Sequence, residues 1–243
     1  MDYSFLQCGE GALTVHLGDG IDPAINRRVT ALQGAIDSAG LHGITDLIPA
    51  YADLTVCYDC TVISAKALQR QLRRLLDSLS VAGQDRRRVF RLPVCYGGDY
   101  GPDLDFVCHH SGLSAQEVIA LHSAPDYLIY MLGFLPGFAY LGGLDPRLPT
   151  PRLDSPRTCI PAGSVGIGGA QTGVYPLASP GGWQLLGRTP VSVFDRQRQE
   201  PILYRAGDLV HFVPISPAEY EEIDRAVAAG TYTVQVEEVP VCD

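Results

Sequence analysis

The stretch that decides the fold runs from Gly133 to Thr189 and reads GFLPGFAYLGGLDPRLPTPRLDSPRTCIPAGSVGIGGAQTGVYPLASPGGWQLLGRT. No other part of the chain is so dense in glycine and proline. Glycine permits positive φ and close backbone approach, whereas proline fixes φ and removes a donor. Short apolar runs between such residues are typical of barrels, so the stretch predicts an antiparallel β-barrel with rigid, shaped loops.

Arginines and aromatic side chains recur inside this stretch. Arg152 and Arg157 bracket the tetrapeptide LDSP, in a loop with no helical face that would call for solvating charge. Planar guanidinium groups bind carboxylates and phosphates through paired hydrogen bonds. We therefore interpret these two arginines as anion ligands, whereas the glycines and prolines alone are explained by tight turns.

Composition bounds the class of protein. The chain has 243 residues, of which 46% are hydrophobic and 19% charged, as in folded proteins of one large or two ordinary domains. The formal net charge of -9 argues against nucleic acid and anionic membranes as partners. Neither a signal peptide nor an apolar run long enough to cross a bilayer is evident, so we expect a cytoplasmic location.

The cysteines and the one lysine exclude several kinds of site. Seven cysteines at irregular spacing include a lone C-x-x-C, Cys57 to Cys60, which favours free thiols over zinc. Lys66 has no glycine nearby, so the chain has no Walker A loop, and GSVGIGG has the wrong spacing for a dinucleotide fingerprint. Any ATP must therefore be handled by arginines, backbone amides or a partner subunit.

The first part of the chain predicts a small α/β domain over residues 1–86. A strand at 12–17 precedes a helix that Asp22-Pro23 opens and Gly40 ends. Residues 44–58 contain a second strand, with Pro49 at an edge or bend, and Ser64 begins another amphipathic helix. Residues 84–88 (QDRRR) are the expected linker.

The remaining residues, 87–243, predict the barrel with a C-terminal helix and strand, so the fold class is α+β. Two capping boxes, at Ser114 and Ser216, open helices, and His122 near the end of the first is assigned a structural role before a catalytic one. Strands are expected at 89–95, 127–132, 164–167, 183–186, 191–194, 209–213 and 231–239.

The central loops lack a complete set of catalytic groups. PAGSVG does not match a nucleophile elbow, and the two carboxylates, Asp145 and Asp154, are expected to form Asx-turns. Such a site is rich in donors and poor in bases. It suits binding of an anion and stabilisation of developing negative charge, with a partner chain supplying the rest.

Four ordered elements, GF-x-PGFAYLGGL, PRL-x-x-PR-x-x-IPAGSV, QTG-x-YP and PGGWQLLGRT, resemble the KipI/allophanate hydrolase subunit 1 family, and a looser resemblance covers nearly the whole chain. The resemblance implies a cyclophilin-like barrel as the C-terminal domain. It also implies a subunit of the B type in an ATP-dependent 5-oxoprolinase, inactive alone. ATP with Mg would be shared with a C-type, KipA-like subunit, and an A-type, LamB/YcsF-like subunit would complete ring opening of the small amide substrate to glutamate.

Under this resemblance Arg152 and Arg157 are the expected catalytic residues, and no metal is expected on this chain. The expected substrate-binding residues are the pocket walls Phe134, Tyr140 and Trp183, the donors Gly163, Ser164, Gly181 and Gly182, and the orienting groups Gln171 and Arg188. Two alternatives remain: a urea carboxylase-type subunit acting on another amide, and a KipI-like inhibitor that binds a sensor histidine kinase. Prolyl isomerase activity would follow from fold analogy alone.

Overall fold

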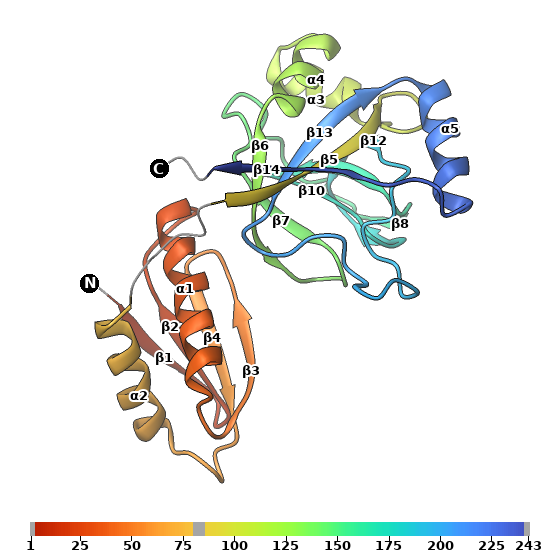
Figure 1. The fold of residues 1–243 in the computed structure, drawn as a ribbon. Helices are drawn as coiled ribbons and strands as arrows, with labels where there is room; N and C mark the ends of the chain where they lie inside the picture. The colour runs from red at the N-terminus through yellow and green to blue at the C-terminus, as the bar shows by residue number, and fades with distance from the viewer. Residues whose placement is uncertain (1–2, 80–85, 241–243) are drawn as a thin grey trace. The chain divides into compact units, whose positions relative to one another are not determined.

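The structure is a computed structural model that describes residues 3–79 and 86–240. The chain divides into two compact units, residues 1–85 and 86–243 (Figure 1). The assignment of residues 1–86 and 87–243 as two independent domains stays a prediction.

The first unit is a four-stranded antiparallel sheet with two helices. Its strand order is β1-β2-β4-β3, and α1 contacts both α2 and the strands β3 and β4. The elements are β1 (Ser4–Cys8), β2 (Ala12–His16), α1 (Pro23–Ala39), β3 (Ile44–Pro49), β4 (Asp53–Tyr58) and α2 (Ala65–Asp77).

Both helices begin where the sequence predicts. Asp22 Oδ1 accepts a 2.6 Å hydrogen bond from the Ala24 amide, and Ser64 caps α2. Gly40, at φ 56°, ends α1, as expected of a residue without a Cβ in the left-handed region. Apolar stripes of the two helices meet the inward side chains of β2 and β4 in one core, which includes Leu13, Val29, Leu32, Val56, Leu68 and Leu72.

The strand content of this unit exceeds the prediction. β1 was not expected, and residues 44–58 form a hairpin of two strands in which the Ala50 amide donates to the Asp53 carbonyl. The resulting order is ββαββα, which makes the sheet wholly antiparallel. Pro49 ends β3, an edge strand that needs no donor on its outer side, so the edge prediction for Pro49 is confirmed.

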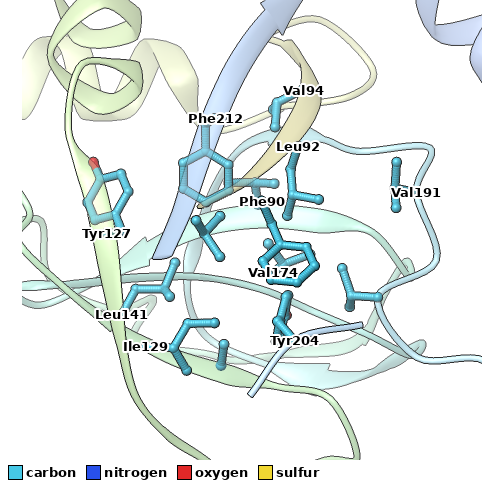
Figure 2. Close-up of a cluster of buried hydrophobic side chains, with 14 residues drawn as sticks. Phe90, Leu92, Val94, Tyr127, Ile129, Leu141, Val174, Val191, Tyr204 and Phe212 are labelled. Carbon is cyan, nitrogen blue, oxygen red and sulfur yellow. The ribbon is translucent and has the colours of Figure 1, made fainter. Parts of the chain in front are cut away.

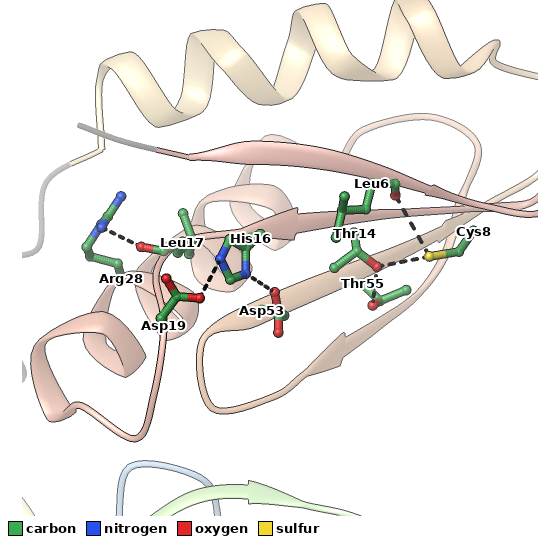
Figure 3. A network of polar contacts seen from close by, with 9 residues as sticks. All are labelled: Leu6, Cys8, Thr14, His16, Leu17, Asp19, Arg28, Asp53 and Thr55. Carbon is green, nitrogen blue, oxygen red and sulfur yellow. Dashed lines mark hydrogen bonds and ion pairs between the residues drawn. The ribbon is translucent and has the colours of Figure 1, made fainter.

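Polar pairs across the first sheet fix its register (Figure 3). His16 Nδ1 lies 2.8 Å from Asp53 Oδ1 on the paired strand, and the Thr14 and Thr55 hydroxyls are 2.8 Å apart. The hydrogen bond to Asp53 raises the pKa of His16. These contacts join neighbouring strands and are explained by the fold alone.

The second unit contains the barrel. Its elements are β5 (Arg86–Tyr96), α3 (Leu104–Ser111), α4 (Ala115–Ser123), β6 (Asp126–Leu132), β7 (Ala139–Gly142), β8 (Arg157–Ile160), β9 (Ser164–Gly168), β10 (Gln171–Val174), β11 (Ser179–Gly181), β12 (Gln184–Arg188), β13 (Leu209–Ile215), α5 (Pro217–Ala228) and β14 (Gln235–Pro240).

Seven strands close the barrel in the order β12-β9-β10-β7-β6-β13-β5, and a β5–β12 pair completes the ring. The α+β class with a closed barrel is therefore confirmed. One detail differs from a purely antiparallel barrel: β5 and β13 run parallel, with Val89 opposite Leu209. β14 pairs with the first half of β5, and β8 and β11 form a separate two-stranded ribbon.

Large apolar side chains fill the barrel (Figure 2). Alternate residues of β5, namely Phe90, Leu92 and Val94, point inward, together with Tyr127 and Phe212 from β6 and β13. Each fully buried side chain of this size stabilises the fold by about 1.5–3 kcal/mol. The barrel interior is therefore a packed core and not a ligand cavity.

Both predicted capping boxes are present. The Ser114 amide donates to Glu117 Oε2 and the Glu117 amide donates to Ser114 Oγ, and Ser216 and Glu219 repeat the arrangement. α3 contacts β12, α4 contacts β13 and α5 contacts β5. No residue of α5 is fully buried, so this helix covers the barrel only partly.

Three sequence predictions for this unit differ from the structure. The boundary between the two units falls after Asp85, inside the expected linker, but residues 86–88 already belong to β5, where Arg88 pairs with Asp208 at 2.6 Å; Gln84 and Asp85 lie outside the described residues. The last strand, expected at 231–239, begins only at Gln235. Residues 191–194 form no strand, and only Phe194 makes an isolated bridge. Val191 and Val193 are nonetheless buried, so their alternation reflects burial on the core and not a ladder.

Candidate functional site

The candidate site lies on the outer face of strands β7, β10, β9 and β12. Gly166, Gly168 and Gly173 present no side chains on this face, and their neighbours Val165, Ile167 and Val174 point the other way. The Trp183 ring packs onto the bare backbone. A Cβ on Gly168 would collide with Trp183 Nε1, which explains why the sequence needs glycine there.

Aromatic rings form a layer over this face. Phe138 is the central ring, with edge-to-face centroid distances of 5.5 Å to both Tyr175 and Trp183 and 5.2 Å to Tyr140. Phe134 adds a fifth ring 5.6 Å from Phe138. Of the expected pocket walls, the structure thus brings Phe134, Tyr140 and Trp183 together, and Phe138 is the residue that joins them.

Phe134 has an unusual backbone conformation. Its φ is 65°, and the Leu135 amide donates a 2.7 Å hydrogen bond to the Gly133 carbonyl around it. This three-residue turn with positive φ is rare and strained for a bulky residue. The Phe134 ring is nevertheless 64% exposed. The loop therefore holds a large apolar ring at the surface at a conformational cost.

Arg152 lies over this aromatic layer. Its guanidinium carbon is 5.9 Å from the Trp183 ring centroid, a cation–π geometry, and its side chain is exposed. Within residues 3–79 and 86–240, no carboxylate lies within ion-pair distance of Arg152. Its hydrogen-bond donors face solvent, as an anion ligand requires.

Arg157 is held in a different way. Its Nη2 lies 2.6 Å from Asp103 Oδ1, and Nη1 donates to the Trp183 carbonyl at 3.4 Å. The ion pair is partly buried, with side-chain exposures of 30% for Arg157 and 12% for Asp103. The sequence prediction missed Asp103, because it lies 54 positions before Arg157 and only the fold brings them together.

The Tyr175 phenol belongs to the same aromatic cluster as Trp183, the residue that both arginines contact. Burial raises its pKa, while a hydrogen bond from the Trp183 amide and the charges of Arg152 and Arg157 oppose that rise. Both arginines therefore act on one hydroxyl. Tyr175 is 2% exposed, so it supports the site from below.

The expected backbone donors at Gly163 and Ser164 are already used. The Gly163 amide donates to the Tyr175 carbonyl at 2.7 Å, and the Ser164 amide donates to the Pro161 carbonyl at 3.3 Å. The prediction of free amides there is wrong, since both bonds hold the turn that enters β9. The Ser164 hydroxyl is fully buried and has no hydrogen-bond partner among the described residues.

The remaining predicted residues fall into two groups. Gly181 lies against the Tyr175 hydroxyl, the Gly182 carbonyl accepts from the Leu153 amide, and Gln171 shares the outward face with Gly173. Arg188 instead stacks over Tyr100, with 5.9 Å from its guanidinium carbon to the ring centroid. No contact joins Arg188 to Arg152 or Arg157 within the part of the chain that the structure describes.

His122 has the structural role that the sequence predicts first. It is fully buried, with Nδ1 2.8 Å from the Tyr96 hydroxyl and Nε2 2.7 Å from Thr172 Oγ1. Thr172 donates its own proton to the Gly166 carbonyl, so Nε2 of His122 carries hydrogen and Nδ1 accepts from Tyr96. Burial lowers the pKa of His122 to about 3, so it stays neutral.

The rest of the described chain shows fewer features of a functional site. The Asx-turn expected at Asp145 is present, since its Oδ1 accepts from the Arg147 amide. Residues 3–79 and 86–240 contain no group of three His, Cys, Asp or Glu side chains arranged to hold a metal ion. None of the helices in these residues is both long and apolar enough to cross a membrane.

The chain is a member of a family of carboxyltransferase-type domains. The family described as "Carboxyltransferase domain, subdomain C and D" matches residues 3–204, and this chain belongs to it. The B-type subunit of 5-oxoprolinase from Bacillus subtilis (strain 168) is 42% identical over 228 residues, which are 90% of this chain and 95% of that protein. The B-type subunit from Escherichia coli O157:H7 is 46% identical over 208 residues, 85% of this chain and 93% of the relative.

Solved structures give the same fold. The crystal structure of TTHA0988 is 40% identical, with a TM-score of 0.75, and the match covers 84% of this chain but 40% of that chain. The Kluyveromyces lactis urea carboxylase matches 98% of this chain with a TM-score of 0.82, at 23% identity, which supports the fold alone. The match covers 24% of that enzyme. This chain thus corresponds to one part of these longer proteins.

Proposed function

We propose that this chain is the B-type subunit of an ATP-dependent 5-oxoprolinase, in which it binds and orients the substrate for cleavage to glutamate. The support is the 42% and 46% identity to 5-oxoprolinase subunits of this type over most of their length. The observation that carries the proposal is Arg152, an exposed cation over the ring of Trp183, the residue whose backbone carbonyl accepts from Arg157. 5-Oxoproline has a carboxylate for the guanidinium groups and a flat, partly apolar ring for the aromatic layer.

The chain's own residues are proposed to bind and polarise, not to transfer protons. Arg152 and Arg157 hold the anionic group through charge-assisted hydrogen bonds. Phe134, Tyr140 and Trp183 exclude water on the ring side. Asp103 is engaged by Arg157 and His122 is buried, so neither is available as a general base. We therefore assign the general base to a partner subunit.

ATP with Mg is proposed as the shared cofactor, which would activate the intact ring by transfer of a phosphoryl group to the lactam carbonyl oxygen, with release of ADP. The arginines fit a phosphate, but the described residues offer no set of oxygen ligands for Mg²⁺. We therefore assign the metal to ATP and to a C-type, KipA-like partner, with an A-type, LamB/YcsF-like subunit completing the reaction. A cytoplasmic location belongs to the same proposal, because the reaction consumes ATP.

Reconstitution tests the proposal. The chain is co-expressed with the C-type and A-type subunits, and ATP hydrolysis and glutamate release are measured with and without 5-oxoproline. We expect 5-oxoproline-dependent turnover that requires this chain. A stable complex without turnover contradicts the substrate and favours another amide, as in urea carboxylases. Failure to form any complex contradicts the subunit assignment and favours a KipI-like binding module.

The arginine variants test the site. Arg152→Ala should reduce kcat/KM for 5-oxoproline by about 10- to 100-fold, the usual cost of losing a charged hydrogen-bond donor to substrate. Arg147→Ala is the matched control, because Arg147 lies in the same loop region but already pairs with Asp145 at 2.8 Å. Equal kinetics for both variants would contradict the role of Arg152.

A further inference from the structure

Asp103 occupies the N-cap position of α3 but does not cap it. Its side chain makes no hydrogen bond to the first turn of the helix, although aspartate is among the best capping residues. Both carboxylate oxygens are used elsewhere: Oδ1 accepts from Arg157 Nη2 and Oδ2 accepts from the Leu185 amide, each at 2.6 Å. The local stabilisation of a cap, about 1 kcal/mol, is given up for these contacts.

The backbone of Asp103 is also fixed to β12. Its amide donates to the Leu185 carbonyl at 3.0 Å, so Asp103 and Leu185 exchange two hydrogen bonds in addition to the helix start. Gly101, two residues earlier, packs so closely on the Leu186 carbonyl that a Cβ would overlap it. The Asp103 carboxylate is therefore held in place by strand β12 of the barrel.

Arg157 needs such an anchor because of where it lies. It begins β8, in the ribbon outside the barrel ring, and its side chain is 30% exposed. Asp103 and the Trp183 carbonyl each accept one hydrogen bond from the guanidinium group. A guanidinium has five N–H donors in a fixed fork, so donors of Arg157 remain for a ligand.

We propose that Asp103 is a positioning residue that fixes the Arg157 guanidinium, so that Arg157 and Arg152 together bind one oxyanion, the carboxylate of the substrate or the phosphoryl group that activates it. The identity of that oxyanion rests on the proposed function, whereas the placement of Arg157 by Asp103 does not. Without the anchor, Arg157 samples several rotamers, and the productive arrangement with Arg152 is populated only part of the time.

Asp103→Asn tests this in the assembled complex with the C-type subunit. The amide oxygen still accepts from the Leu185 amide, but the neighbouring NH₂ cannot accept from Arg157. We expect a rise of about tenfold or more in KM for 5-oxoproline, with a smaller change in kcat. Asp103→Glu keeps the charge and should recover at least a third of the wild-type kcat/KM. Asp105→Asn, an exposed carboxylate on the same helix, is the matched control.

Calorimetric titration with 5-oxoproline and, separately, with inorganic phosphate separates this inference from the proposed function. If the wild type binds phosphate but neither binds nor cleaves 5-oxoproline, the proposed function fails, and weaker phosphate binding by Asp103→Asn alone still supports positioning. Equal affinities for the wild type and Asp103→Asn would overturn it. If Asp103→Asn does not fold, Arg157→Lys and Asp103→Glu are titrated instead. An Arg157→Lys variant that binds both anions with wild-type affinity would overturn the inference.

Discussion

At the scale of single residues, Phe134 combines strain with exposure. We predict that Phe134→Gly raises the free energy of unfolding of the second unit by about 1 kcal/mol, because glycine adopts positive φ without strain. Phe134→Ala removes the ring but keeps the strained backbone, so it should bring no such gain. Urea unfolding followed by Trp183 fluorescence measures both. Equal shifts for the two variants would show that the backbone is not strained.

His122 makes the stability of the second unit depend on pH. Its folded pKa of about 3 lies below the unfolded value near 6.5, so the unfolded state binds the proton more readily. The stabilisation is complete above pH 6.5 and is lost as pH falls. We predict a decrease of up to about 1.4 kcal/mol per pH unit between pH 6.5 and 4.

The control for this effect is a histidine at the surface. His109→Gln, on the exposed face of α3, is the matched control variant, and His122→Gln should flatten the pH profile. Urea midpoints at pH 7, 6 and 5, followed by Trp183 fluorescence, measure the profile. A profile for His122→Gln as steep as the wild type would assign the acid sensitivity to other groups.

At the scale of elements, the bare outer face of β9 and β10 determines where Trp183 packs. We predict that Gly168→Ala destabilises the second unit by about 1–3 kcal/mol and changes the Trp183 emission maximum, because the new methyl group displaces the ring. Gly34→Ala, in an open part of α1, is the control and should stabilise the first unit by about 1 kcal/mol. An unchanged emission maximum in Gly168→Ala would contradict this packing.

The elements also show how far the sequence could predict the structure. Helices were predictable from local signals: Asp22-Pro23, Ser64 and the two capping boxes act within one turn of chain. The short strands β8, β10 and β11 were not, because each has three or four residues and its pairing depends on distant partners. For Val191 and Val193 the alternating pattern predicts a strand that the structure lacks, because both side chains are buried against the core without strand pairing.

In the candidate site, too, local features were predictable from the sequence and contacts between distant residues were not. Its aromatic layer and Arg152 belong to one continuous stretch, and their residue types already indicated an anion site. Asp103 carried no local signal, because an aspartate before a helix reads as a cap. The occupied amides of Gly163 and Ser164 were equally hidden, since only the β9 turn shows which carbonyls accept from them.

At the scale of the whole molecule, the two compact units have separate cores and the tryptophan belongs to the second. We predict that Leu72→Ala, in the core of the first unit, lowers that unit's stability by about 2–5 kcal/mol without moving the Trp183 unfolding midpoint. Unfolding followed by circular dichroism should then show two transitions, and unfolding followed by Trp183 fluorescence should show one. A parallel shift of the fluorescence midpoint would contradict the division into independent domains.

The parallel pair of β5 and β13 has a consequence for biosynthesis. Val89 meets Leu209, about 120 positions later in the chain, and the ring cannot close before that partner exists. At ribosomal rates this leaves the apolar β5 without its neighbour for on the order of ten seconds. During this interval the edges of the barrel strands already synthesised are unpaired, so we expect the folding yield during synthesis to depend on protection of these edges.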